Sequence, residues 1–238
     1  MTDEFRSWLL GSDHSFEALL GSVRFDDVTT GRRGTVLVKT GARGIPIVRS
    51  TTPYHAPAQP FGLIHDRLAS AIGAGFNNAL VEHYTRPYSS MKRHSDQALD
   101  LVEGSSIAVY SCYRDPARPS RRLIVKAKGA GDAFEIPLDH GSVVAFSLDA
   151  NRRFTHAIAL RPNAPDNDWF GITFRTSKTL VRFIDGQPIL PSGARLTLAT
   201  EDQRRELFQM RRRENDETSF AYPAISYTLS ESDLVPPV

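Results

Sequence analysis

Residues 155–176 read THAIALRPNAPDNDWFGITFRT, two apolar runs on either side of a turn. The runs at 155–160 and 170–176 are rich in β-branched and aromatic residues, and Asn163, Pro165 and Asp166 between them are typical turn residues. The same pattern continues outward, with further strands expected at 79–84, 106–113, 122–127, 142–146 and 180–183. Many short strands at this spacing predict a sandwich or barrel, mainly β with flanking helices.

The segments around the strand-rich region are of mixed type. Short helices are expected at 5–10 and 15–20, a strand at 35–40, a proline-rich loop at 51–60, and helices at 61–72 and 201–213. Because we find no internal repeat or low-complexity linker, we expect one domain over 1–238. It would comprise N-terminal helices and a substrate lid (1–60), a β core (61–184) and a C-terminal extension (185–238).

Composition limits the function. Lys and Arg total 29 against 27 for Asp and Glu, a formal net charge of +2, which argues against a protein that coats a polyanion. A single cysteine, Cys112, excludes an internal disulfide framework and a Cys-rich zinc site, and it fits a reducing compartment. No apolar run approaches the ~20 residues of a membrane span. We therefore expect a soluble, cytoplasmic protein with no membrane partner, and the sequence leaves its oligomeric state open.

The histidines contain one arrangement that suits a metal. His94-Ser95-Asp96 places an imidazole and a carboxylate two residues apart, so in an extended segment both leave the same face. His156 lies in a predicted strand. Two imidazoles and one carboxylate form the facial triad of non-haem Fe(II) sites. The alternatives are a chance His-x-Asp pair and a histidine that only packs in the core.

Arg175 directly follows the apolar run at 169–174 and is the one charged residue of this predicted strand. A buried guanidinium is costly without an anion, and its planar fork suits a carboxylate. The residue either binds an anionic ligand or forms a structural salt bridge at the end of a strand.

An ordered set of motifs resembles the AlkB-like branch of the Fe(II)/2-oxoglutarate dioxygenases, over about half the chain. The matching segments run in the family's order: Pro60-Phe61 with its helix, the strand ending at Tyr84, His94-Ser95-Asp96, the turn and strand at 138–144, the segment around His156, and Thr173-Phe174-Arg175.

This resemblance implies a double-stranded β-helix core of the jelly-roll or cupin-like type. It implies that His94, Asp96 and His156 bind Fe(II) as the catalytic centre. The cosubstrates would be O2 and 2-oxoglutarate, the latter beside Tyr84, Thr173 and Arg175. The implied reaction is hydroxylation of a C–H bond with release of succinate and carbon dioxide. On an N-methyl group, the product would break down to formaldehyde and free amine.

The sequence departs from the family at three positions. Trp169 stands where the family has a second arginine for the distal carboxylate of 2-oxoglutarate, so Arg175 with Ser177, or another basic residue, would have to replace it. Glu82 stands where the family has an amide. Ala98 stands where the repair enzymes have an acid near the substrate base, which makes oxygenation a firmer expectation than nucleobase demethylation.

The substrate is less determined than the reaction. Tyr54 either stacks on a flipped base or packs in its proline-rich loop. Basic clusters would form either a phosphate track or a solvated surface; they are Arg118, Arg121 and Arg122, Lys126 and Lys128, and Arg152 with Arg153. We expect a nucleobase in nucleic acid or in a free nucleotide or nucleoside. The alternatives are hydroxylation of a small metabolite, such as an amino acid or natural-product intermediate, and a binding module without turnover.

Overall fold

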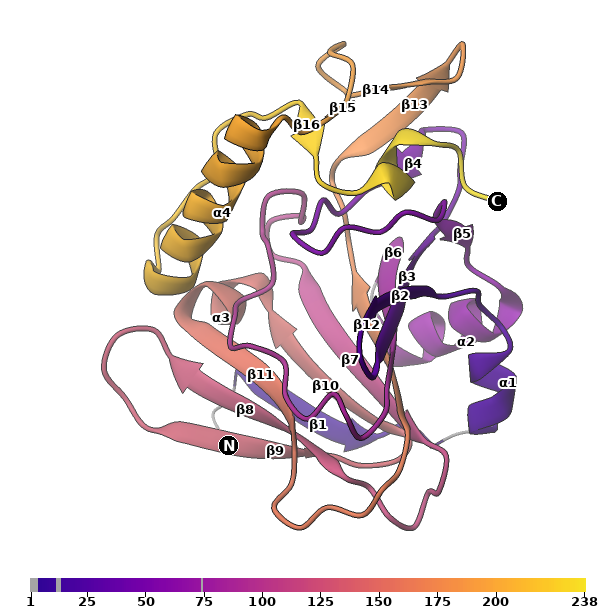
Figure 1. The fold of residues 1–238 in the computed structure, drawn as a ribbon, viewed down its shortest axis with the longest axis vertical. Coiled ribbons are helices and arrows are strands. Elements are labelled where there is room, and N and C mark those ends of the chain that lie inside the picture. The colour runs from indigo at the N-terminus through magenta and orange to yellow at the C-terminus, as the bar shows by residue number, and fades with distance from the viewer. Residues whose placement is uncertain (1–3, 12–13, 74) are drawn as a thin grey trace.

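The computed structural model describes residues 4–11, 14–73 and 75–238. Its centre consists of two antiparallel sheets, between which the chain alternates from residue 78 to residue 175 (Figure 1). The larger sheet contains β6 (Asn78–Tyr84), β7 (Ser106–Tyr113), β10 (Ser142–Ser147) and β12 (Trp169–Arg175), in the order β10-β7-β12-β6. The smaller sheet contains β8 (Arg121–Ala127), β9 (Ala133–Leu138) and β11 (Phe154–Leu160), in the order β11-β8-β9.

This winding is that of a jelly roll, so the expected mainly β fold with a double-stranded β-helix core is confirmed. The strands predicted within the region 79–176 are present within one residue at each end. β9 was not predicted. It forms the edge of the smaller sheet, where Pro137 removes no hydrogen bond that a further strand needs.

The amino-terminal segment differs from the prediction. The helix expected at 5–10 is wrong, because Phe5–Leu9 forms β1, which pairs antiparallel with β10 at one edge of the larger sheet. The second expected helix is present as α1 (Phe16–Leu20), whose first turn is capped by the Ser15 hydroxyl. At the opposite edge of the sheet lie β2 (Asp26–Thr29), β3 (Arg32–Val38) and β5 (Gln59–Pro60).

The two faces of the larger sheet are buried by different partners. Its outer face packs under α1 and α2 (Leu63–Ile72), with Val81, Ile172 and Phe174 in that layer (Figure 1). Its inner face packs against the smaller sheet through residues such as Val109 and Leu123. Because side chains alternate along a strand, every second residue counted from Tyr84 on β6 and from Trp169 on β12 points between the sheets. That interior is where the polar residues of the candidate site lie.

After β12 the chain returns over the open end of the barrel. β13 (Leu180–Ile184) pairs with β4 (Ile45–Pro46) and with β14 (Gln187–Ile189), and β15 (Thr197–Leu198) pairs with β16 (Tyr227–Thr228). Two further helices complete the fold: α3 (Leu148–Arg153) connects β10 to β11 within the core, and α4 (Glu201–Asp216) lies in the part after β12.

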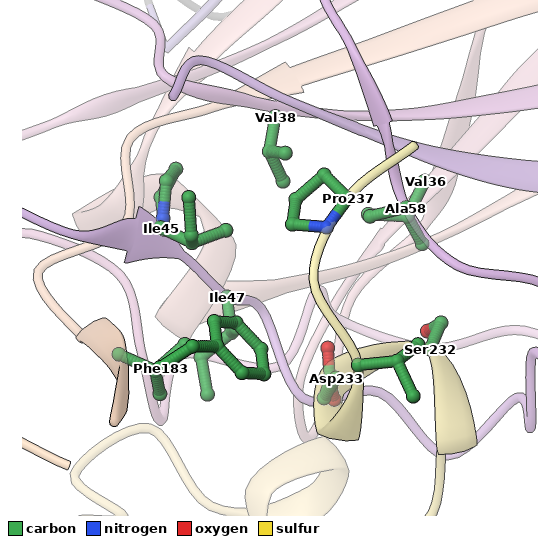
Figure 2. A pocket seen from close by; sticks show the side chains of 12 residues that line it. Val36, Val38, Ile45, Ile47, Ala58, Phe183, Ser232, Asp233 and Pro237 are labelled. Atoms are coloured by element: carbon green, nitrogen blue, oxygen red, sulfur yellow. The ribbon is translucent and has the colours of Figure 1, made fainter. Parts of the chain in front are cut away.

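The carboxyl-terminal residues pack against the amino-terminal strands. The segment after the short 3₁₀ helix Glu231–Leu234 brings Pro237 to a small apolar cavity that Val36 and Ala58 also line (Figure 2). Its volume of about 10 Å³ is near that of one water molecule, so it is a packing gap and not a ligand site. Among the described helices, none has the length and apolar content needed to cross a membrane.

Candidate active site

The three predicted metal ligands converge at one end of the space between the sheets. His94 lies in the segment between β6 and β7 and pairs with His156 of β11 through two backbone hydrogen bonds of 2.9 and 2.7 Å. Their ring centroids are 4.7 Å apart. Asp96, two residues after His94, points to the same place, so the ligand atoms of all three lie within 4.8 Å of one another. The alternation of an extended segment therefore has the predicted effect.

The hydrogen bond of His94 leaves its second ring nitrogen available to a metal. The Nδ1 atom of His94 is 2.9 Å from the carbonyl oxygen of Lys92, which can only accept, so Nδ1 donates and Nε2 carries the lone pair. That Nε2 atom is 3.7 Å from Asp96 Oδ1, and the Nε2 atom of His156 is 3.5 Å from the same oxygen. In the neutral tautomer that this bond selects, the lone pair of His94 faces a carboxylate, which is repulsive unless a cation lies between them. The donor set therefore fits a metal ion.

The charges of the site also suit a metal. Burial alone would raise the pKa of the Asp96 carboxyl, but the Arg175 guanidinium, with smaller contributions from the two histidines, holds it well below its usual range. Arg175 Nε donates to Asp96 Oδ2 at 2.7 Å. Burial lowers the pKa of His156, which Asp96 offsets in part. An ionised carboxylate and a neutral imidazole are the forms that bind a metal.

The segment 94–100 is held in place by neighbours far away in the sequence. The buried side chain of Asn151, at α3, accepts from the Asp96 backbone N–H and donates to the Asp96 carbonyl oxygen, both at 2.7 Å. From α4, Arg211 donates to the Ser95 carbonyl oxygen at 2.7 Å. The sequence pattern did not indicate Asn151 or Arg211, because nothing near them in the chain shows where their partners lie.

A cavity of about 630 Å³ opens from the metal-ligand group. All three predicted ligands line it, together with Thr173 and Arg175 from β12. Its walls also include residues from the interior faces of both sheets and from α4, among them Leu80, Val109, Leu123, Ile158 and Phe208. This volume lies within the roughly 300–1,000 Å³ usual for small-molecule sites.

The residues that depart from the AlkB-like pattern have clear contacts. Glu82 pairs with Arg32 from β3, with the guanidinium Nη2 atom 2.6 Å from Oε1. Although burial lowers it, Glu82 raises the pKa of Arg32 above its usual range. The Ser177 hydroxyl, proposed from the sequence as a helper of Arg175, instead bonds to the carbonyl oxygens of Ile47 and Thr179. The Ser177 hydroxyl therefore stabilises a loop and is not available to a ligand beside Arg175. Trp169 is almost completely buried.

Tyr84 and Tyr54 do not line the cavity. Tyr84 is completely buried, with its ring centroid 4.8 Å from that of Trp169. Tyr54 is 2% exposed, and its ring packs directly on Gly34, where any Cβ would lie within 3.0 Å of it. Of the two alternatives for Tyr54, the structure shows the packed one, because the Gly34 surface accepts the ring.

Most of the basic clusters predicted from the sequence are already engaged. Arg121 is fully buried, Arg122 pairs with Glu135, and Lys128 donates to backbone carbonyls at the carboxyl-terminal end of α4. Arg152 pairs with Glu103 and Asp149, and Arg153 pairs with Glu4. These contacts contradict a phosphate track made of free cations at these positions.

The cavity has another basic rim, of which the sequence indicated only Arg212, as part of the charged end of the helix predicted at 201–213. Lys92, Arg93 and Arg212 are exposed and line it, and none of them forms an ion pair within the part of the chain that the structure describes. Phe208, one helical turn before Arg212 on α4, is an exposed aromatic residue at the same opening. Lys92 and Arg93 directly precede the predicted metal ligand His94, and this proximity in the sequence could have indicated that they lie near the site.

Comparisons with known proteins add little. No family model matches the chain, and no curated protein matches it. Among solved structures, one titled "The structure of OsALKBH1" is similar over 61% of this chain and 78% of that chain, with 15% identity and a TM-score of 0.40. This likeness is too weak to carry a function across, so the functional conclusion rests on the geometry of the site.

Proposed function

We propose that this protein is an Fe(II)- and 2-oxoglutarate-dependent oxygenase of AlkB-like type. The observation that carries the proposal is the convergence of His94, Asp96 and His156 at the end of a jelly-roll interior. Two imidazole nitrogens there face one carboxylate oxygen at 3.7 and 3.5 Å, beyond hydrogen-bond length. A facial set of this kind leaves open positions on an iron ion for cosubstrate and oxygen.

The chain's own residues would divide the work at this site. His94, Asp96 and His156 would hold the metal, and Arg175 would orient Asp96 and keep it ionised through the 2.7 Å hydrogen bond. Thr173 would contact the cosubstrate from the cavity wall. Bound iron and 2-oxoglutarate would supply oxidation of a C–H bond by O2, with release of succinate and carbon dioxide. The apolar walls would position the substrate and exclude competing reductants.

The rim of the cavity supports an anionic substrate. Lys92, Arg93 and Arg212 place unpaired positive charge around the opening, and Phe208 offers an aromatic face for stacking. A nucleobase is planar in all three forms considered, the nucleotide, the nucleoside and the nucleic acid. The nucleotide and the nucleic acid also carry negative phosphate charge. This substrate remains our first choice, with Phe208 in the stacking role that Tyr54 cannot fill.

A small anionic metabolite is the second candidate. The enclosed volume of about 630 Å³ suffices for such a molecule, and Ala98 supplies no acid for recognition of a base. The two candidates differ in their response to salt, since binding through several phosphates weakens steeply with ionic strength. Succinate release, measured across methylated oligonucleotides, nucleotides and amino acids at two salt concentrations, distinguishes them.

The metal assignment is tested separately from the substrate. Anaerobic addition of Fe(II) and 2-oxoglutarate should produce the weak visible charge-transfer band of the chelate, and His94→Ala should abolish it. His55→Ala is a suitable control, because His55 is an exposed histidine that pairs with Glu231 away from the cavity. The absence of any band in the wild-type protein, or its persistence in His94→Ala, would contradict the proposed function.

A further inference from the structure

Arg121 is a fully buried cation in the barrel interior. It is the first residue of β8, and with Leu123 and Val125 it belongs to the buried positions of that strand's alternating pattern. Its backbone N–H donates to the Tyr113 hydroxyl at 3.0 Å, which fixes the start of the strand. An enclosed guanidinium normally has an anion beside it, because burying an unpaired charge is costly.

The protein itself satisfies only part of this guanidinium. Nη2 donates to the carbonyl oxygens of Thr85 and Tyr88 at 3.0 and 2.9 Å. Nε and Nη1 are buried without a hydrogen-bond partner, and no carboxylate in the described ranges lies within ion-pair distance of Arg121. Burial lowers the pKa of this side chain, and nearby tyrosines and the more distant Glu82 carboxylate offset that effect in part. Three of the five N–H donors, one on Nε and two on Nη1, therefore remain for an acceptor.

The neighbours of Arg121 are also unsatisfied donors. Its guanidinium lies 5.0 Å from the centroid of the Tyr84 ring. The Tyr84 hydroxyl is buried and forms no hydrogen bond of normal geometry with the described residues, and burial together with the nearby Glu82 carboxylate raises its pKa. Trp169, whose ring centroid is 4.8 Å from that of Tyr84, has a buried Nε1–H group with no hydrogen-bond partner in the part of the chain that the structure describes. Its indole lies over Gly171, where a Cβ would be only 2.0 Å from the ring, so this placement requires glycine. A group of adjacent buried donors without an acceptor points to an anionic ligand.

The position of this group relative to the metal ligands defines the kind of anion. His156 lies opposite Val125 in the pairing of β11 with β8, and Arg121 is four residues before Val125 on the same face. Four residues of strand span about 13 Å. Leu123, between them, lines the cavity that begins at the metal ligands. A ligand that reaches both ends must carry an anionic group well separated from its metal-binding end.

We propose that Arg121 and the Tyr84 hydroxyl bind the distal carboxylate of the 2-oxo dicarboxylic acid cosubstrate, a role for which Trp169 offers no positive charge. The inference rests on the proposed function. It places the side chain that binds the distal carboxylate on β8 of the smaller sheet. Arg175 on β12 then has a different role, the hydrogen bond to the metal ligand Asp96. Arg121 is thus a binding residue for the cosubstrate, and Trp169 Nε1–H is an additional donor beside it.

The test compares two 2-oxo acids that differ only at the distal end. Fe(II)-loaded protein is titrated anaerobically with 2-oxoglutarate and with 2-oxovalerate, which lacks the distal carboxylate, and the visible charge-transfer band gives each dissociation constant. Arg121→Gln should weaken 2-oxoglutarate binding ~10- to 100-fold, as expected for loss of charged hydrogen bonds, and leave 2-oxovalerate within about twofold. Tyr84→Phe should weaken 2-oxoglutarate alone by about fivefold.

Arg122→Gln is the matched control, because Arg122 is the next residue on β8, faces outward and pairs with Glu135. It should change neither constant. Equal effects of Arg121→Gln on both acids, or no effect on 2-oxoglutarate, would overturn the assignment. If Arg121→Gln does not fold, an unchanged 2-oxoglutarate constant in Tyr84→Phe overturns it instead. Absence of a band with either acid in the wild-type protein would overturn the proposed function, and this inference with it.

Discussion

Asp96 and Asp100 are four residues apart on one segment, both are buried, and both pair with an arginine. Their remaining bonds differ. Asp100 Oδ1 accepts from Arg49 Nη2 and from the Thr179 hydroxyl, and its Oδ2 accepts from the Arg49 backbone N–H and Nε. These donors fill the roughly four acceptor sites of a carboxylate. Asp96 Oδ2 accepts from Arg175, whereas among the described residues its Oδ1 faces only the two imidazole nitrogens.

The difference separates a carboxylate that holds the fold from one that is available to a ligand. Arg49 also donates to the carbonyl oxygen of Ile225, so the Asp100 pair joins the segment around Arg49, the connection between β12 and β13 at Thr179, and the carboxyl-terminal region. No atom of Asp100 lines the cavity, while Asp96 does. Burial and an arginine partner are therefore insufficient evidence of a site, and the unsaturated oxygen decides between the two residues.

The largest expected effect is on stability at Asp100. Asp100→Ala would leave Arg49 buried without its anion, and breaking a buried pair in this way costs about 3–5 kcal/mol. Asp96→Ala should cost less than half of that in the metal-free protein, because Arg175 borders the cavity, and it should abolish the Fe(II) chelate band. Urea unfolding of both metal-free variants measures the two costs. Equal destabilisation would contradict the distinction between the two carboxylates.

Asp233 is a third buried carboxyl, and it makes the stability of the fold depend on pH. Burial raises the pKa of this carboxyl to about 6, a hydrogen bond from Thr228 opposes the increase and Asp100 adds to it. Between pH 4 and 6 the folded state thus binds more protons than the unfolded state, whose Asp pKa is about 3.9. The free energy of unfolding from this group therefore falls as pH rises through that range, by about 2–3 kcal/mol.

Asp233→Asn should remove this decrease in the free energy of unfolding, because an amide does not titrate. The variant should be more stable than the wild-type protein at pH 7 by about 2 kcal/mol and nearly equal to it near pH 4, since the amide oxygen can still accept from Thr228. Urea unfolding at pH 4.5, 5.5 and 7 provides the measurement. A difference that is constant over these three pH values would mean that Asp233 does not titrate in this range.

The sequence predicted those parts of the molecule that depend on local signals. The jelly-roll strands could be located because runs of β-branched and aromatic residues are bounded by turn residues, and the alternation of an extended segment brought His94 and Asp96 to one face. Phe5–Leu9 was predicted wrongly, because five residues with an apolar cluster fit either a helix or a strand. Only pairing with β10, more than 130 residues later, makes this segment a strand.

Residues whose role depends on distant partners could not be found in this way. Asp100 and Arg49 are 51 positions apart, and Asn151 reaches Asp96 over 55 positions. Arg121 appeared in the sequence as part of a basic cluster, although the alternation of β8 buries it and exposes Arg122 in part. The register of a strand determines which of two adjacent arginines is inside, and composition does not contain that information.

The smallest expected effect concerns the support of Asp96. Asn151→Ala removes the two 2.7 Å hydrogen bonds to the Asp96 backbone and should lower Fe(II) affinity about tenfold, since residues that orient metal ligands typically contribute this much. Asn77→Ala is the control, because Asn77 makes the same pair of hydrogen bonds to the backbone of Ser177, at 2.9 and 2.8 Å. Both variants lose about the same number of bonds, so both should lose similar stability. Fe(II) titration should distinguish them, with weaker binding in Asn151→Ala only. Equal affinity in the two variants would show that Asn151 supports the fold near Asp96 without positioning the ligand.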